Sequence, residues 1–200
     1  MTRTELINKI VHDLLNDGFS VHLNRCVDIN GWSGWFDADD ENKEFVVSLD
    51  HPFGFETMIH EYCHYLQWKN KRQLWDSIDN TYGVLIDWFE DSEVSATEEE
   101  LDQSFHDIIL LEHDCEMMSL NFAIQNCIEN FDPKRYIQAA NLYLWHYHFN
   151  RRFRKKPNLP ICATNAVDIM STTFKNDYKF YLNLDNLETY RQDRIIQEYS

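Results

Sequence analysis

The chain has 200 residues, 44% of them hydrophobic and 14% aromatic, which is enough to build a buried core and excludes a disordered chain. Its 34 acidic and 18 basic residues give a formal net charge of −16, which disfavours binding to a nucleic-acid backbone as the main function. The sequence has no apolar run near the roughly 18 residues that a membrane span needs. The five cysteines form no C-x-x-C pair and the first residues lack a signal-peptide pattern, so we expect a cytoplasmic protein.

The first seventy residues carry the patterns of a helix, three strands and a second helix. Apolar residues from Leu6 to Leu15 recur at helical spacing, and runs rich in β-branched and aromatic residues follow them. The polar stretch 37–42 is typical of a turn between the second and third strands. We interpret the three short strands as an antiparallel meander. The predicted elements are a helix over 5–17, strands at 19–28, 32–37 and 44–49, and a helix over 54–70.

The rest of the chain has a mainly helical pattern, and the whole sequence contains only five glycines and four prolines, which argues against many tight turns. The segment PNLPIC at 157–162 is expected to break helical structure. Further helices are predicted over 72–90, 97–129, 134–154 and 186–198. We therefore expect an α+β fold in one domain over 1–200, made of a front half (1–70), a helical half (71–156) and a wrapping tail (157–200).

Charge is segregated along the sequence. Between Gln73 and Pro133 there are sixteen acidic residues and no lysine or arginine. Five basic residues then crowd together at 151–156. The simpler interpretation is that both stretches are solvated helix faces. The alternative is an acidic rim that attracts basic peptides, with the basic cluster docking an acidic partner.

Residues 56–68 read ETMIHEYCHYLQW and contain the motif H-E-x-x-H, formed by His60, Glu61 and His64. On a helix, positions i and i+4 share one face, so the two imidazoles can bind one Zn²⁺ at about 2.0–2.1 Å. Glu61 can then act as general base toward a water molecule and pass the proton to the leaving amine. The competing interpretation is an exposed helix with two ordinary histidines.

A catalytic zinc ion needs a third protein ligand, and the best candidates lie at 110–123. Glu112 and Glu116 are again four residues apart, so one can bind the metal while the other holds the second ring nitrogen of a ligand histidine. An acidic pair that faces solvent is the alternative. The neighbouring His113 and Asp114 are other possible ligands, but each points off that face. Cys63 and Cys115 lie beside the motifs, and we favour helix packing over metal binding for both.

Two further features bear on catalysis. On the predicted helix 134–154, Tyr147 and His146 are candidate donors to the oxyanion of a tetrahedral intermediate. Tyrosine and histidine side chains that recur along one helix are, however, more often part of the core. The strand at 32–37 can offer an edge along which a peptide adds as an extra strand. His12, His22, His51 and His106 have no spacing relation to the motif and are expected to be structural or exposed.

These motifs resemble those of the gluzincin metallopeptidases, in which H-E-x-x-H is followed by a helical glutamate. The second helix is similar to the E-x-E-A-D-x-x-A signature of CAAX prenyl protease-like enzymes, and by that match Glu112 is the metal ligand and Glu116 the acid behind it. The membrane spans of those enzymes are absent, so this likeness is confined to the site. A closer resemblance is to small metallopeptidase-like proteins of tailed bacteriophages, carried by HEYCHYLQW (60–68), EHDCE (112–116) and YIQAANLY (136–143).

The resemblance implies a minimal zincin-like core, one Zn²⁺ per chain and a location in the host cytoplasm or the virion. The resulting hypothesis is zinc-dependent hydrolysis of a peptide or protein substrate, with His60, His64 and Glu112 as ligands and Glu61 as base. A second hypothesis is a non-catalytic zinc-containing phage protein, structural or regulatory, that binds a host or virion partner. A third is an acidic decoy for a basic host protein, whose binding would weaken steeply with salt.

Overall fold

The computed structural model describes residues 1–29, 33–39, 42–91, 93–155 and 166–199. It has six α-helices in this described part, together with three strands, so the predicted α+β class is confirmed. The elements are α1 (Arg3–Asn16), β1 (Ser20–Asn24), β2 (Gly34–Asp39), β3 (Asn42–Ser48), α2 (Gly54–Asn70), α3 (Arg72–Glu90), α4 (Glu98–Gln125), α5 (Pro133–Phe153) and α6 (Thr189–Ile196).

The predicted helices all form, and their bounds follow the hydrophobic pattern. The helix predicted over 54–70 has these same bounds in α2. The long pattern at 97–129 becomes α4, which runs without a break from Glu98 to Gln125. The segment 157–162 lies outside the described residues. In the part of the chain that the structure describes, every helix is too short or too polar to cross a membrane.

The chain divides into two compact units. The first contains Met1–Arg72 and Cys115–Pro133, and the second contains Gln73–Asp114 and Lys134–Ser200. The division falls inside α4, so this helix contributes its C-terminal half to the first unit and its N-terminal half to the second.

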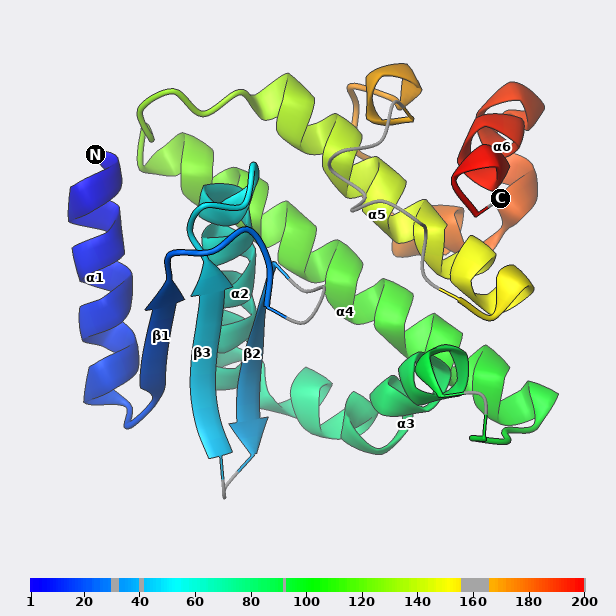
Figure 1. Ribbon diagram of the computed structural model, residues 1–200, viewed down its shortest axis with the longest axis horizontal. Coiled ribbons are helices and arrows are strands. Elements are labelled where there is room, and N and C mark those ends of the chain that lie inside the picture. Colours follow the sequence, from blue (N-terminus) through cyan, green and yellow to red (C-terminus); the bar gives the residue numbers. More distant parts are fainter. Residues whose placement is uncertain (30–32, 40–41, 92, 156–165, 200) are drawn as a thin grey trace. The chain divides into compact units, whose positions relative to one another are not determined.

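The sheet of the first unit differs from the predicted antiparallel meander, which is wrong. Its strand order is β1-β3-β2, with β1 parallel to β3 and β2 antiparallel to β3 (Figure 1). A meander would place β2 in the centre, but the most apolar strand is β3, whose Phe45, Val46 and Val47 are all buried. The residues of β1 and most of those of β2 are partly exposed, as expected for edge strands.

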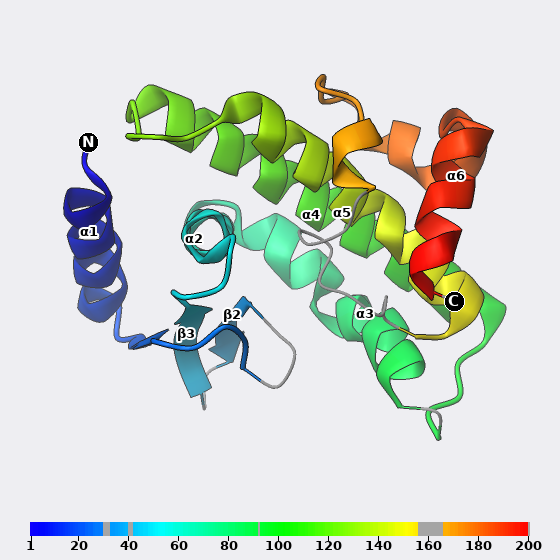
Figure 2. The same cartoon turned by 45° about the horizontal axis from the view of Figure 1, so that its top comes forward.

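Helix α2 covers one face of this sheet, as Figures 1 and 2 show from two directions. The core between them includes Phe45 and Val47 from β3 and Met58 and Ile59 from α2, with Leu6 of α1 in the same cluster. Each of these five side chains is 0% exposed. The apolar face of α2 therefore packs inward and fixes where its polar residues lie.

Close backbone contact holds the start of α2 against the sheet at Gly54. A Cβ atom added there would lie 2.3 Å from the backbone oxygen of Ser48, which is too close to be accommodated without a backbone shift. We expect Gly54→Ala to lower the free energy of unfolding by about 1–3 kcal/mol. The matched control is Gly83→Ala in α3, where the nearest atom, on the Asp87 side chain, is 3.7 Å away. That change should stabilise the helix by about 0.5–1 kcal/mol, and urea denaturation of both variants tests the contrast.

Polar contacts also tie α1 to α2. The Tyr65 hydroxyl donates to Asp17 Oδ2 at 2.7 Å, and Lys69 Nζ lies 2.7 Å from the same oxygen. One turn earlier, the Tyr62 hydroxyl donates to Asp13 Oδ2 at 2.6 Å. Asp13 in α1 and Asp17, which caps the end of that helix, thus each accept a hydrogen bond from a tyrosine of α2, which fixes the rotation of α2 about its axis.

This arrangement predicts a pH dependence of stability. Hydrogen bonds from Lys69 and then Tyr65 lower the pKa of Asp17 below its usual value. A carboxylate with a lowered folded-state pKa stabilises the fold above its unfolded pKa of about 3.9, and this contribution is lost as the pH falls through the folded-state pKa. We expect Asp17→Asn to cost about 1 kcal/mol at pH 7 and less at pH 2. Chemical denaturation at both pH values tests this, and the cost at pH 7 should shrink in a Lys69→Met background.

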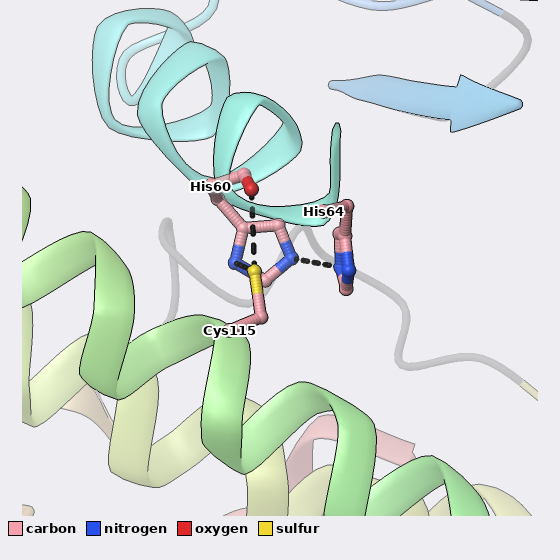
Figure 3. A group of neighbouring side chains, drawn as sticks. All are labelled: His60, His64 and Cys115. Atoms are coloured by element: carbon pink, nitrogen blue, oxygen red, sulfur yellow. Dashed lines mark hydrogen bonds between the residues drawn. The ribbon is translucent and has the colours of Figure 1, made fainter. Parts of the chain in front are cut away.

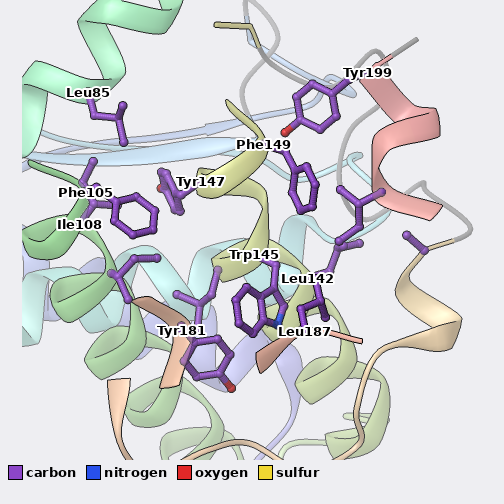
Figure 4. Packing of buried hydrophobic residues seen from close by; sticks show 14 of the residues in the cluster. Leu85, Phe105, Ile108, Leu142, Trp145, Tyr147, Phe149, Tyr181, Leu187 and Tyr199 are labelled. Carbon is purple, nitrogen blue, oxygen red and sulfur yellow. The ribbon is translucent and has the colours of Figure 1, made fainter. Parts of the chain in front are cut away.

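The second unit has a separate core of large aromatic residues (Figure 4). Trp145 and Phe149 of α5 pack with Phe105 of α4 and with Tyr181 and Tyr199 from the C-terminal segment. The C-terminal segment is held to α5 by polar contacts as well. The Asn141 amide donates to the carbonyl oxygen of Ser171 at 2.8 Å, and His148 Nε2 donates to that of Tyr181 at 2.7 Å.

Charges that are separated in the sequence meet within this second unit. Arg151 contacts Glu98 at 2.8 Å and Asp102 at 2.5 Å, both in the first turns of α4. Arg154 donates to the backbone oxygen of Trp88 at 3.0 Å, near the end of α3. These two members of the basic cluster therefore have intramolecular acceptors, in addition to their exposure to solvent.

Candidate metal centre

Helix α2 presents His60 and His64 on one face, one turn apart (Figure 3). Their Nε2 atoms face each other at a distance of 3.0 Å. Two nitrogen ligands at 2.0–2.1 Å from a tetrahedral ion are roughly 3.3–3.4 Å apart, so this separation is close to that of a shared metal ion. His64 is only 6% exposed, and the side chain of His60 is 13% exposed. The pair is thus largely shielded from water.

The other nitrogen of each ring faces an oxygen acceptor. His60 Nδ1 lies 3.2 Å from Glu116 Oε1, and His64 Nδ1 lies 2.9 Å from Gln67 Oε1. Carboxylate and amide oxygens accept hydrogen bonds, so each Nδ1 is placed to donate one. When both rings are neutral, their Nε2 atoms point lone pairs at each other, and a cation between them removes that repulsion. A hydrogen bond between the two Nε2 atoms is the alternative, and it requires one ring to carry a proton on both nitrogens, as a protonated His60 beside the Glu116 carboxylate would. The donor set therefore fits a divalent metal ion.

Cys115 of α4 lies against His60 as well. Its thiol donates to the backbone oxygen of His60 at 3.2 Å, and Sγ is 3.7 Å from His60 Nδ1. The ligand atoms of His60, His64 and Cys115 all lie within 4.8 Å of one another, so these three residues could hold a metal ion. The expectation that Cys115 serves only for packing is therefore incomplete, because its sulfur is both buried and beside the histidines. Cys63 is also buried, and this burial raises its pKa, which keeps it a thiol.

Glu61 follows His60 in α2 and is 9% exposed. The helix approaches β2 closely just before this point. A Cβ atom on Gly34 would lie 2.7 Å from Val46 O and 2.9 Å from Thr57 Cγ2, so the start of β2 runs directly beside α2. Because Thr57 lies about one helical turn before His60 and Glu61, the N-terminal end of β2 lies near the motif.

In the second unit, two more of the predicted site residues meet. Glu112 is 1% exposed, and the Tyr147 hydroxyl donates to its Oε1 at 3.5 Å. The Tyr143 hydroxyl in turn bonds the Tyr147 hydroxyl at 2.7 Å. Glu112 and Tyr147 are therefore neighbours, and Tyr143 joins them.

His146 is placed differently from Tyr147. It is 1% exposed, and its Nδ1 lies 2.8 Å from the Tyr199 hydroxyl. Burial lowers the pKa of His146 to about 3, so the ring is neutral at pH 7. Its environment is that of a core histidine that anchors the C-terminal segment. His113 has a comparable role, since its Nε2 donates to the backbone oxygen of Lys175 at 2.6 Å.

Sequence reasoning overlooked Gln67 as a partner of His64. A signal for it was present, because positions i and i+3 share a helix face.

Comparisons with protein-family models, with curated proteins and with solved structures found no match.

Proposed function

We propose that this chain is a zinc-dependent peptidase of the gluzincin type. The observation that carries the proposal is the pair of Nε2 atoms 3.0 Å apart, each on a ring whose Nδ1 faces an oxygen acceptor. Two imidazoles together with a carboxylate form a ligand set that suits zinc. His60 and His64 would hold the ion, and sequence resemblance supplies Glu112 as the third ligand.

Zinc bound there would act as a Lewis acid and lower the pKa of a water molecule to about 7. The Glu61 carboxylate would accept a proton from the attacking water and deliver it to the amide nitrogen of the leaving group. The Glu116 carboxylate would keep the proton of His60 on Nδ1 and so orient that ring. Tyr147 remains the proposed donor to the oxyanion of the tetrahedral intermediate.

A zincin-like core in the first unit is part of the same proposal. Support comes from α2, which lies on one face of the sheet, and from β2, which pairs only with β3 within the described residues. A peptide could add along the other edge of β2, whose first residue Gly34 lies against α2. The test is hydrolysis of a quenched fluorescent peptide library by the zinc-loaded protein, with the Glu61→Gln variant as the inactive form.

The position of Cys115 favours a second candidate function. A site made of His60, His64 and a Cys115 thiolate would be a metal site without the glutamate ligand of the gluzincins. Such a site could stabilise a non-catalytic protein that binds a host or virion partner. The two candidates differ in the third ligand, and they also differ in whether Glu61→Gln changes function.

A further inference from the structure

We infer that Gln67 is a positioning residue that selects the metal-binding nitrogen of His64. This inference rests on the proposed metal site and assigns a role to a residue that the H-E-x-x-H motif does not include. Gln67 is fully buried, and its Oε1 lies 2.9 Å from His64 Nδ1. The two residues are three positions apart on α2 and therefore share a face of the helix.

The mechanism follows from the tautomers of histidine. A neutral imidazole carries one proton, and an acceptor placed at Nδ1 holds the proton there and leaves Nε2 with a lone pair. Because Gln67 is buried, water does not compete for its amide oxygen. The lone pair of His64 Nε2 then points toward His60 Nε2, and the ion would be bound by both of these nitrogens. Without Gln67, His64 can take its proton on Nε2, and this tautomer cannot bind the ion through that atom.

The partners of the two histidines also differ in charge. His60 is held by the carboxylate of Glu116, whereas His64 is held by the neutral amide of Gln67. An amide orients the ring without adding a second buried negative charge behind the site. Gln67→Glu should therefore keep the tautomer and bind a divalent ion at least as tightly, because a carboxylate accepts the same hydrogen bond and attracts the cation.

The test compares three variants of Gln67 in protein with ¹⁵N-labelled histidine. Gln67→Met removes the acceptor, Gln67→Asn withdraws it by one methylene, and Gln67→Glu retains it. Long-range ¹H–¹⁵N correlation spectra of the chelator-treated protein report the tautomer of His64, and a competition titration with Zn²⁺ reports affinity. We expect Gln67→Met and Gln67→Asn to lose the pure Nδ1–H tautomer and to bind Zn²⁺ about 10- to 100-fold more weakly.

The matched control is Gln138→Met. Gln138 is in α5, and its amide donates to the backbone oxygens of Asp168 and Met170, with no histidine partner. This variant should keep the tautomer of His64 and the Zn²⁺ affinity of the wild type. If Gln67→Met does not fold, as judged by thermal denaturation, the tautomer of His64 and the Zn²⁺ affinity are compared between Gln67→Asn and the wild type.

The outcomes separate this inference from the proposed function. A wild-type protein that binds no Zn²⁺ would defeat the metal site, while a tautomer change in the Gln67 variants would still establish the positioning role. Unchanged tautomer and affinity in both Gln67→Met and Gln67→Asn would overturn the inference, even with a zinc ion bound.

Discussion

Replacing Glu61 with glutamine is expected to abolish peptide hydrolysis and to leave the metal content unchanged. Glutamine has nearly the same size as glutamate, so the neighbouring His60 and His64 keep their places in α2, but its amide cannot take up a proton. Loss of a general base reduces rates by about 100- to 10,000-fold. Initial rates on a quenched fluorescent peptide library, measured beside zinc content for the same preparations, test both parts of this expectation.

The control for this experiment is Glu56→Gln, which makes the same change in the first turn of α2. Its hydrolysis rate should stay close to that of the wild type. A Glu61→Gln protein that cleaves peptides as fast as the wild type would refute the peptidase mechanism. A wild type that binds zinc and cleaves no peptide would favour the second candidate, the non-catalytic binding protein.

The helices were predictable from the sequence because their signal is local. In α2, the apolar positions Met58, Ile59 and Tyr62 recur at helical spacing, and they are the residues that the structure buries. The same spacing places His60 and His64 together without any knowledge of the fold. The pair His64 and Gln67 is equally local, but their spacing alone does not show that the Gln67 amide oxygen faces a ring nitrogen.

The pairing of the strands was not predictable in the same way. The pattern within a strand does not identify its neighbours, and the order β1-β3-β2 requires a parallel partner from another part of the chain. The buried run Phe45–Val47 could have indicated the central strand, since such runs are typical of strands covered on both sides.

Contacts between residues that are distant in the sequence also could not be predicted from local patterns. Helical spacing alone makes Glu112 and Glu116 equivalent, and the family resemblance assigns Glu116 to the position behind a ligand histidine. The fold shows which histidine this is, because Glu116 approaches His60, 56 positions earlier in the chain, while Glu112 contacts Tyr147. The basic cluster is a similar case. The sequence left open that Arg151 binds an acidic partner molecule, but the fold places Glu98 and Asp102 of the same chain beside it.

Loss of metal from the His64→Ala variant is the second large effect that we expect. The wild type should hold about one zinc ion per chain, and His64→Ala should hold almost none, because removing one of two imidazoles leaves too few strong ligands. Metal analysis after purification without chelators provides the measurement. His12→Ala serves as the control, since the His12 side chain is 74% exposed on α1. Equal zinc content in His64→Ala and the wild type would refute the site.

Substituting Co²⁺ for zinc can then show which residue is the third ligand, because Co²⁺ has an absorption spectrum that depends on its ligands. A thiolate bound to Co²⁺ gives a charge-transfer band in the near ultraviolet, whereas a carboxylate does not. If Cys115 is a ligand, Cys115→Ser should remove that band, and Cys63→Ser should leave it unchanged. If Glu112 is the ligand, the band should be absent from the wild type, and Glu112→Gln should lose the metal. The first result would favour the non-catalytic candidate, and the second would support a gluzincin ligand set, in which Glu61 has a catalytic role.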